Sequence, residues 1–188
     1  LLLTEADDVV GTQTTLQVRS KSKAWNAKVE AMFKAEMIDQ PCDVTGRFNV
    51  QKILHTGFLT YRRDGDMFLL LTDAGLEACE GEQCGTPWGQ AEARLFHVTN
   101  GVVTSKRSGR VLGYYLGRPN QWGYIQSDAV RRFPAEKVHH IWNGDRFSYT
   151  RGEPALTSAV EHIDKVTRYE DAELVAAHVN ACLSLSVT

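Results

Sequence analysis

The chain has 188 residues and a mass of 21.0 kDa, a length that suits one domain or two small ones. Apolar residues make up 43% and charged residues 23%, which is ordinary for a globular protein and argues against disorder, collagen and coiled coils. The formal net charge of -2 excludes a chain that grips nucleic acid over its whole surface. No apolar run approaches the roughly 18 residues that a membrane span requires.

The cysteines indicate the compartment in which the chain folds, and its two ends indicate whether it is a fragment. Four cysteines stand at irregular spacing, at positions 42, 79, 84 and 182, in a chain long enough to fold without cross-links. We therefore expect folding in a reducing, cytoplasmic compartment. The chain begins with Leu1 and ends in an alternating stretch, 183–188, that is typical of an opening strand. From these ends we expect a fragment of a longer protein.

The first third of the chain is predicted to be mainly helical. Residues 1–10 are expected to form a helix that ends at Gly11, followed by a half-buried strand over 14–19. Apolar residues at helical spacing predict a second helix over 24–37, which must end before Pro41.

A third helix is predicted after a polar loop at 42–47, with Asn49 as its N-cap. The turn at 64–66 should end this helix and lead into a buried strand over 67–72. The apolar positions expected on the inner face of the helix are Val50, Ile53, Leu54 and Phe58.

The middle of the chain predicts an irregular loop and then a small antiparallel sheet. Glycines, two cysteines and Pro87 favour a long loop over 74–89. Strands are predicted over 93–98 and 111–116, and Asn100-Gly101 is typical of a tight hairpin turn. Another strand is expected to end at Asn143-Gly144.

The last segment gives the strongest helical signal. Apolar residues recur every three or four positions from Ala155 to Leu183, and Pro154 suits the first turn of such a helix. Six acidic residues against two basic ones follow residue 152, so this helix is the acidic part of the chain.

Few residue patterns point to catalysis. Asp64-Gly65-Asp66 lacks the further oxygen ligands of a calcium loop and is better explained as a turn. His139 and His140 are adjacent, so on a strand they face opposite ways and cannot share one metal; we expect one packed and one exposed. Neither a nucleophile elbow nor a phosphate-binding loop motif occurs.

A zinc site is a weak alternative for the cysteines. Cys79 and Cys84 are spaced more widely than the pairs of zinc ribbons, and His97 would supply only a third ligand. No metal or other cofactor is therefore predicted, and two free thiols are the expected state.

Three stretches together resemble the portal protein of tailed bacteriophages, lambda family. The first runs from Cys42-Asp-Val-Thr-Gly-Arg-Phe-Asn49 to Arg63-Asp-Gly-Asp-Met-Phe68, and the second is Arg132-Phe-Pro-Ala-Glu-Lys-Val-His139. The third is Arg151-Gly-Glu-Pro154 with Tyr169-Glu-Asp-Ala-Glu-Leu-Val-Ala-Ala177, which is the most specific. Their order and spacing span nearly the whole chain but only the front part of the longer family protein.

The resemblance implies an α+β fold, with a mainly antiparallel wing, helices packed on it and a long C-terminal stem-type helix. Residues 1–150 would be the wing, 151–183 the helix leading into the stem, and 184–188 the start of the clip strand, where the chain is truncated.

The resemblance also implies a structural, non-enzymatic role. Family members form a ring, usually of twelve subunits, at one capsid vertex of the virion and are assembled in the host cytoplasm. The ring is the channel for double-stranded DNA, which passes without sequence specificity. Its partners are other copies of itself, the major capsid and scaffold proteins, the terminase, and neck or adaptor proteins.

Two groups of residues on the long helix are expected to serve this role. The expected packing seam between subunits comprises Arg168, Tyr169, Ala172, Ala176 and Val179. The expected acidic face, which would discourage DNA from binding the channel wall, comprises Glu161, Asp164, Glu170, Asp171 and Glu173. The same carboxylates are equally well explained as a solvated outer face or as partners of Lys165 and Arg168 of neighbouring subunits.

Two other function classes stay open at this stage. One is a metal-dependent hydrolase or nuclease that uses Asp64, Asp66, His139 and His140, and the other is a monomeric adaptor module. Bound metal and cleavage that Asp64→Ala abolishes would favour the first, and small discrete particles in place of rings would favour the second.

Overall fold

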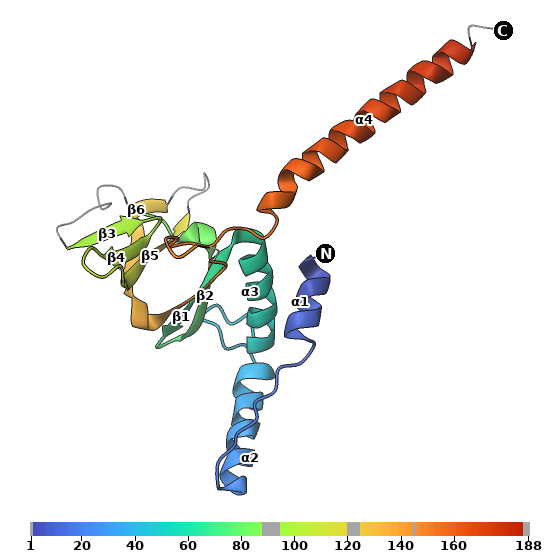
Figure 1. Cartoon of the computed structure of the whole chain (residues 1–188). Coiled ribbons are helices and arrows are strands. Elements are labelled where there is room, and N and C mark those ends of the chain that lie inside the picture. The colour runs from blue at the N-terminus through green and yellow to red at the C-terminus, as the bar shows by residue number, and fades with distance from the viewer. Residues whose placement is uncertain (1, 88–94, 120–124, 145, 186–188) are drawn as a thin grey trace. The chain divides into compact units, whose positions relative to one another are not determined.

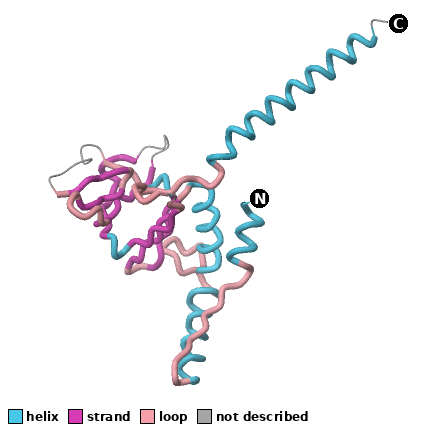
Figure 2. The backbone as a smooth tube through the Cα atoms, viewed as in Figure 1, coloured by secondary structure: helices cyan, strands magenta, loops and turns pink. Residues whose placement is uncertain are grey.

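A computed structural model describes residues 2–87, 95–119, 125–144 and 146–185 of the chain. The chain divides into two compact units, Leu1–Pro154 and Ala155–Thr188 (Figures 1 and 2). Helices and antiparallel sheets occur in the same unit, which confirms the α+β class. Among the described residues, no helix is both long and apolar enough to cross a bilayer.

The helices of the N-terminal unit lie mostly before its sheets. They are α1 (Leu2–Val10), α2 (Lys23–Phe33), the π-helical η1 (Lys34–Ile38), α3 (Val50–Asp64) and the short 3₁₀ turns η2 (Gly81–Gln83) and η3 (Ala135–Lys137). Asn49 caps α3 as predicted, because its side-chain oxygen accepts a hydrogen bond from Lys52 N at 2.9 Å. Gly11 closes α1 with a positive φ of 72°.

Two antiparallel sheets form the rest of this unit. One has the order β2-β1-β7, from Gly75–Glu80, Asp66–Thr72 and Val138–Trp142. The other has the order β3-β4-β5-β6, from Phe96–Thr99, Val102–Ser105, Val111–Pro119 and Ile125–Pro134. The turn at Asn100-Gly101 joins β3 and β4 with φ values of 49° and 82°, which confirms the predicted hairpin.

The core joins the two sheets. Its buried residues are Phe68, Leu70, Cys79, Cys84, Val102, Tyr114, Leu116 and Val138, and partly buried side chains surround them. Side chains alternate along β1, so Phe68 and Leu70 face this core while Met67 faces α3. Gly57 of α3 has no side chain, which lets Met67 Sδ approach the helix backbone. β1 is therefore covered on both faces.

Two expectations from the sequence are wrong for this unit. Residues 14–19 form no strand; this stretch runs beside α2, where Val18 N donates to Glu30 Oε1 at 2.8 Å. The stretch 74–89 is not one long loop, because β2 pairs with β1 from Gly75 to Glu80. The glycines there serve a tight β1–β2 turn, at Gly75, and a short 3₁₀ turn, at Gly81.

The second unit is formed by one helix, α4 (Thr157–Leu185). This confirms the helical periodicity over 155–183. The strand expected from residue 183 is wrong in its first part, because α4 continues through Leu185, and residues 186–188 lie outside those described. Leu is a good helix former and Ser is tolerated, so their alternation by itself does not end the helix.

The C-cap of α3 is a test of backbone packing. Gly65 has a φ of 92°, and a methyl group there would lie 2.6 Å from backbone atoms of Gly152 and Glu153. Gly11 caps α1 in the same way, with a φ of 72°, but has open space around it.

We expect Gly11→Ala to lower the free energy of unfolding by about 1 to 2 kcal/mol, the cost of a left-handed alanine. Gly65→Ala should lower the free energy of unfolding by clearly more, because its methyl group would also clash with the backbone at Gly152. Equal losses in urea unfolding would show that the contact with Gly152 contributes nothing.

Candidate functional site

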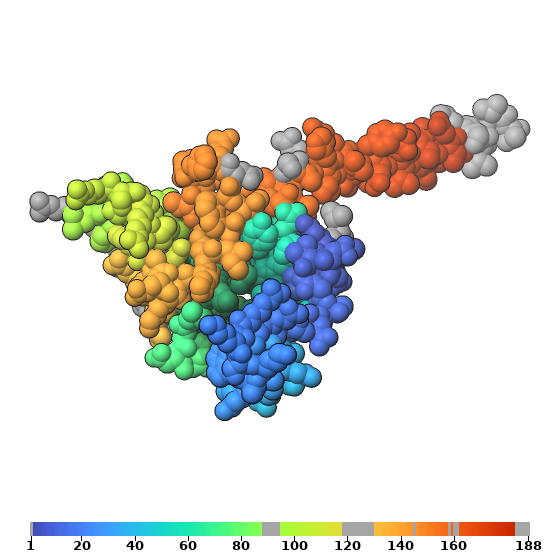
Figure 3. All heavy atoms as spheres, turned by 60° about the horizontal axis from the view of Figure 1, so that its bottom comes forward, coloured from blue at the N-terminus to red at the C-terminus, as the bar shows by residue number. Residues whose placement is uncertain are grey.

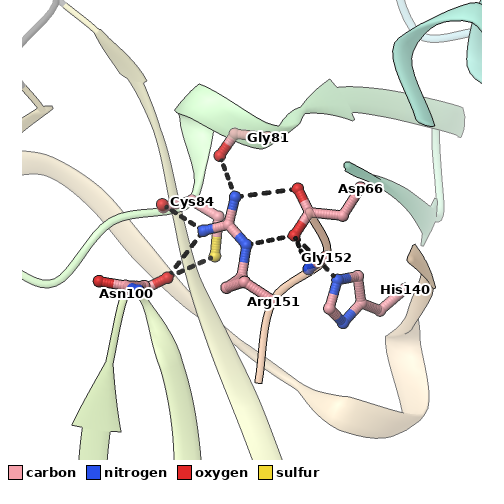
Figure 4. Close-up of polar contacts among 7 residues, drawn as sticks. All are labelled: Asp66, Gly81, Cys84, Asn100, His140, Arg151 and Gly152. Carbon is pink, nitrogen blue, oxygen red and sulfur yellow. Dashed lines mark hydrogen bonds and ion pairs between the residues drawn. The ribbon is translucent and has the colours of Figure 1, made fainter. Parts of the chain in front are cut away.

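A buried carboxylate lies where β1 begins. Asp66 is 1% exposed and stands on the same face of β1 as Phe68. An isolated ionised carboxylate in such a place would cost several kcal/mol, so its partners decide whether the fold is stable. Arg151, which arrives from the far end of the N-terminal unit, is the main partner (Figure 4).

Arg151 uses all of its five N–H groups. Nε donates to Asp66 Oδ2, and Nη2 donates to Asp66 Oδ1 at 3.0 Å, so the pair is bidentate. The remaining hydrogen bonds go to backbone carbonyls: Gly81 at 2.6 Å, Cys84 at 2.9 Å and Asn100 at 2.9 Å. One side chain thus connects β1, the η2 turn and the β3–β4 hairpin. We call Asp66 and Arg151, with the carbonyls that Arg151 binds, the arginine clamp.

His140 completes the surroundings of Asp66. Its Nε2 lies 3.3 Å from Asp66 Oδ2, and the side chain is 7% exposed. The ring stacks between Phe68, with centroids 4.4 Å apart, and Trp142, with centroids 5.8 Å apart. His139 is exposed on the other face of β7, so the prediction of one packed and one exposed histidine is confirmed.

Asp66 and Arg151 both stay ionised inside the fold. Burial alone would raise the pKa of Asp66, but hydrogen bonds from His140 and Arg151 and the positive charge of Arg151 hold the pKa below its ordinary value. Burial would lower the pKa of Arg151, but its hydrogen bonds with Asp66 raise it overall. The carboxylate and the guanidinium therefore neutralise each other inside the fold.

This arrangement is suited to holding segments together and not to catalysis. Of the four residues considered for a nuclease, only Asp66 and His140 come together, and Arg151 occupies the carboxylate on which a metal would depend. Asp64 instead accepts two hydrogen bonds of 2.7 Å from the Arg63 guanidinium. Within the described ranges, no group of three or more histidine, cysteine or acidic side chains is placed to hold a metal.

The two cysteines considered for zinc lie inside the fold. Cys79 and Cys84 are buried, whereas Cys182 is exposed. Burial, more than any charge, raises the pKa of the Cys84 thiol to about 12, so it stays protonated at neutral pH. A protonated thiol is a poor nucleophile.

The surface of α4 carries the other residues that the sequence singled out. The described side chains from His162 to Cys182 are all exposed, including the expected seam residues Arg168, Tyr169, Ala172, Ala176 and Val179. Asp164 pairs with Arg168 at 3.0 Å, and the Tyr169 hydroxyl donates to Glu173 Oε1, which raises the pKa of Tyr169. The side chain of Glu161 lies outside the described residues, while Glu170 and Asp171 are exposed.

α4 also exposes large apolar side chains. Ile163, Val166, Tyr169, Leu174, Val175 and Val179 are between 49% and 70% exposed. A long helix with this composition is ordinarily covered by other helices.

A family model described as phage portal protein, lambda family, matches residues 3–188. The chain belongs to the lambda family of phage portal proteins. No curated protein matches it. Portal proteins of this family are structural components of the virion that act at the capsid as an oligomeric ring. The match extends over both units and includes the arginine clamp and α4.

Single motifs do not reveal the clamp. The pattern at 64–66 indicates a turn, and Arg151 stands out only within the Arg-Gly-Glu-Pro stretch that resembles the portal family. The signal in the sequence is an Asp at the start of an apolar strand. Such a carboxylate is buried when the strand is, and a buried carboxylate requires a cationic partner. Nothing in the sequence indicated which of the 21 lysines and arginines would supply it.

The clamp predicts a large difference between two arginines. Arg151→Lys retains the charge but lacks the planar fork, so several of the carbonyls lose their donor. We expect the free energy of unfolding to fall by about 3 kcal/mol or more. Arg63→Lys is the control, because Arg63 also binds a carboxylate through a fork but is 57% exposed, and its loss should stay below about 1 kcal/mol. Similar losses in chemical unfolding would contradict the assigned role.

The lowered pKa of Asp66 predicts acid sensitivity. A carboxylate whose pKa is lower in the folded than in the unfolded chain stabilises the fold above its unfolded value, about 3.8, and this contribution is lost as the pH falls through the folded value. Unfolding free energies measured from neutral pH to about pH 3 should therefore decline, and Asp66→Asn should flatten this decline. An unchanged pH profile in Asp66→Asn would show that other carboxylates cause it.

Proposed function

We propose that this portal protein forms the ring channel through which the phage genome enters and leaves the capsid. Membership of the family supports the ring and the position at the capsid. The finer parts of the proposal are a single capsid vertex, a ring of usually twelve subunits, assembly in the host cytoplasm, and docking of the terminase and then of neck proteins. In this proposal the N-terminal unit is the wing and α4 leads into the stem.

The observation that carries the proposal is the distribution of apolar residues around α4. With 3.6 residues per turn, Tyr169, Ala172, Ala176 and Val179 fall within about a quarter of a turn and form one face. Ile163, Val166 and Leu174 form a second face, centred about 140° away. A helix with two apolar faces fits a position between two neighbours, which a ring supplies to every subunit.

The first face is built for close approach. Ala172 and Ala176 lie between Tyr169 and Val179, and small side chains let helix backbones come near each other. The second face has branched side chains in place of alanines, and Val166 is 56% and Leu174 70% exposed. The different shapes of the two faces suit a head-to-tail contact, in which one face of each subunit meets the other face of the next.

Three of the carboxylates lie between these faces. By the same helical geometry, Asp164 and Asp171 form one row and Glu173 lies on the opposite side, so the expected acidic face is not continuous. Glu170 falls within the second face, one turn from both Val166 and Leu174. A row that lines a channel would weaken DNA binding, because fewer cations on the wall means fewer counterions released on contact. DNA is then able to slide past the wall.

The clamp has a mechanical role in this proposal. It fixes the segment just before α4 to three parts of the wing through Arg151, and Gly152 N donates to Asp66 Oδ2 at 3.3 Å. Force on the stem helix during packaging would therefore reach both sheets of the wing.

Imaging of the protein tests the proposal directly. The purified full-length protein should appear as rings with a central opening in negative stain, and only small single particles would contradict it. Val166→Asp and Val179→Asp, one on each apolar face, should each abolish the rings, since an unpaired charge buried between helices costs several kcal/mol.

Asp171→Asn is the matched control for these variants. It changes an exposed residue of the same helix outside both apolar faces, so rings should persist. Circular dichroism of each variant separates loss of assembly from loss of fold. Rings that survive both valine substitutions would show that the packing faces are assigned wrongly.

A further inference from the structure

The N-terminal unit carries an arm that its own chain leaves uncovered. The arm (residues 12–38) consists of an extended stretch, α2 and η1, and extends away from the two sheets beyond the start of α3 (Figure 1). No residue of α2 is buried, although it spans 11 residues and its N-cap is well formed, with Ser22 Oγ accepting from Trp25 N at 3.3 Å. The surface of α2 is therefore available for contact with another molecule.

That surface has an apolar ridge with a cation at its centre. Trp25, Lys28 and Met32 are spaced by three and four residues, so they lie side by side on one face of α2. Trp25 is 53% and Met32 is 48% exposed, while Val29 and Phe33 are half-buried on the adjoining side. Tryptophan is among the residues most often found at the centre of protein interfaces.

The same unit has a groove between α1 and α3 that is apolar, as the ridge is. Its volume is about 510 Å³, and its lining includes Val9, Leu54, Phe58, Met67 and Ile141. Val9 is 65%, Leu54 42% and Ile141 45% exposed, so water is in contact with these side chains in the single chain. The blue α1 and the blue-to-cyan arm are visible together on one face of the molecule (Figure 3).

The arm and α1 carry opposite net charges. The arm contains Arg19, Lys21, Lys23, Lys28 and Lys34 against two acidic residues, Glu30 and Glu36. α1, which borders the groove, contains Glu5, Asp7 and Asp8 and no lysine or arginine. Glu5 pairs with Arg62 and Asp7 with His55 of α3, and Asp8 is exposed. Complementary charge of this kind orients two surfaces as they meet.

We propose that the ridge of one subunit inserts into the α1–α3 groove of the next subunit. The inference rests on the proposed ring, because a ring needs two different patches on each copy, one of which meets the other on its neighbour. A second copy fits better than DNA, since two of the three ridge residues are apolar and phosphates would leave them exposed. The contact adds to the α4 faces and ties the wings together.

Cross-linking of the full-length protein tests this inference. In a background with Cys42→Ser and Cys182→Ser, the double variant Met32→Cys, Val9→Cys should give a ladder of multimers with a short bismaleimide. A ladder is expected because each copy carries both halves of a head-to-tail contact. Met32→Cys, Leu3→Cys is the matched control: Leu3 is 64% exposed on the same helix as Val9 but does not line the groove.

The outcomes are distinct from those of the ring test. A ladder several-fold stronger with Val9→Cys than with Leu3→Cys supports the inference. Intact rings with no ladder, or with equal ladders, would overturn it while the proposed function stands, whereas absence of rings in the parent protein overturns both. Intact rings without a ladder, together with DNA binding that Lys28→Gln weakens, would assign the arm to nucleic acid instead.

Discussion

The N-terminal unit depends on the neutralisation of one buried carboxylate. Asp66 must open β1, because it ends the turn that follows α3, and the register of β1 places its side chain on the core side. The fold answers with Arg151, whose five hydrogen bonds satisfy both the carboxylate and three backbone carbonyls. Removal of either partner leaves the other charged and buried, which is worse than having neither. The two sheets, the η2 turn and the segment before α4 are therefore stabilised together.

The two units present opposite physical situations. The first buries its apolar residues within one chain, between two sheets and against α3. The second leaves Ile163, Leu174 and similar side chains open to water along one helix. Such a helix gains its stability from what covers it, which agrees with a protein family that works as an assembly.

Much of the secondary structure was predictable from local patterns. Asn49, Gly65 and the Asn100-Gly101 turn act through their own backbone geometry, so the sequence alone located the ends of α3 and the β3–β4 hairpin. β2 was hidden because its glycines suggested a loop, while its strand character comes from pairing with β1. The clamp was not predictable from local patterns, since its two charged residues are far apart in sequence and their pairing is a property of the tertiary fold. The stretch 14–19 shows the opposite case: its alternation predicts a strand, but it has no strand partner and forms none.

The distance along the chain between Asp66 and Arg151 has a consequence for biosynthesis. The two residues are separated by 85 positions, so a ribosome delivers the carboxylate long before its cation. Until Arg151 emerges, burial of the ionised Asp66 side chain costs several kcal/mol, so we expect the two sheets to close fully only afterwards. The final closure of the N-terminal unit is thus timed to the appearance of its last few residues. Vectorial synthesis would complete each subunit's body just before its long helix becomes available to neighbouring copies.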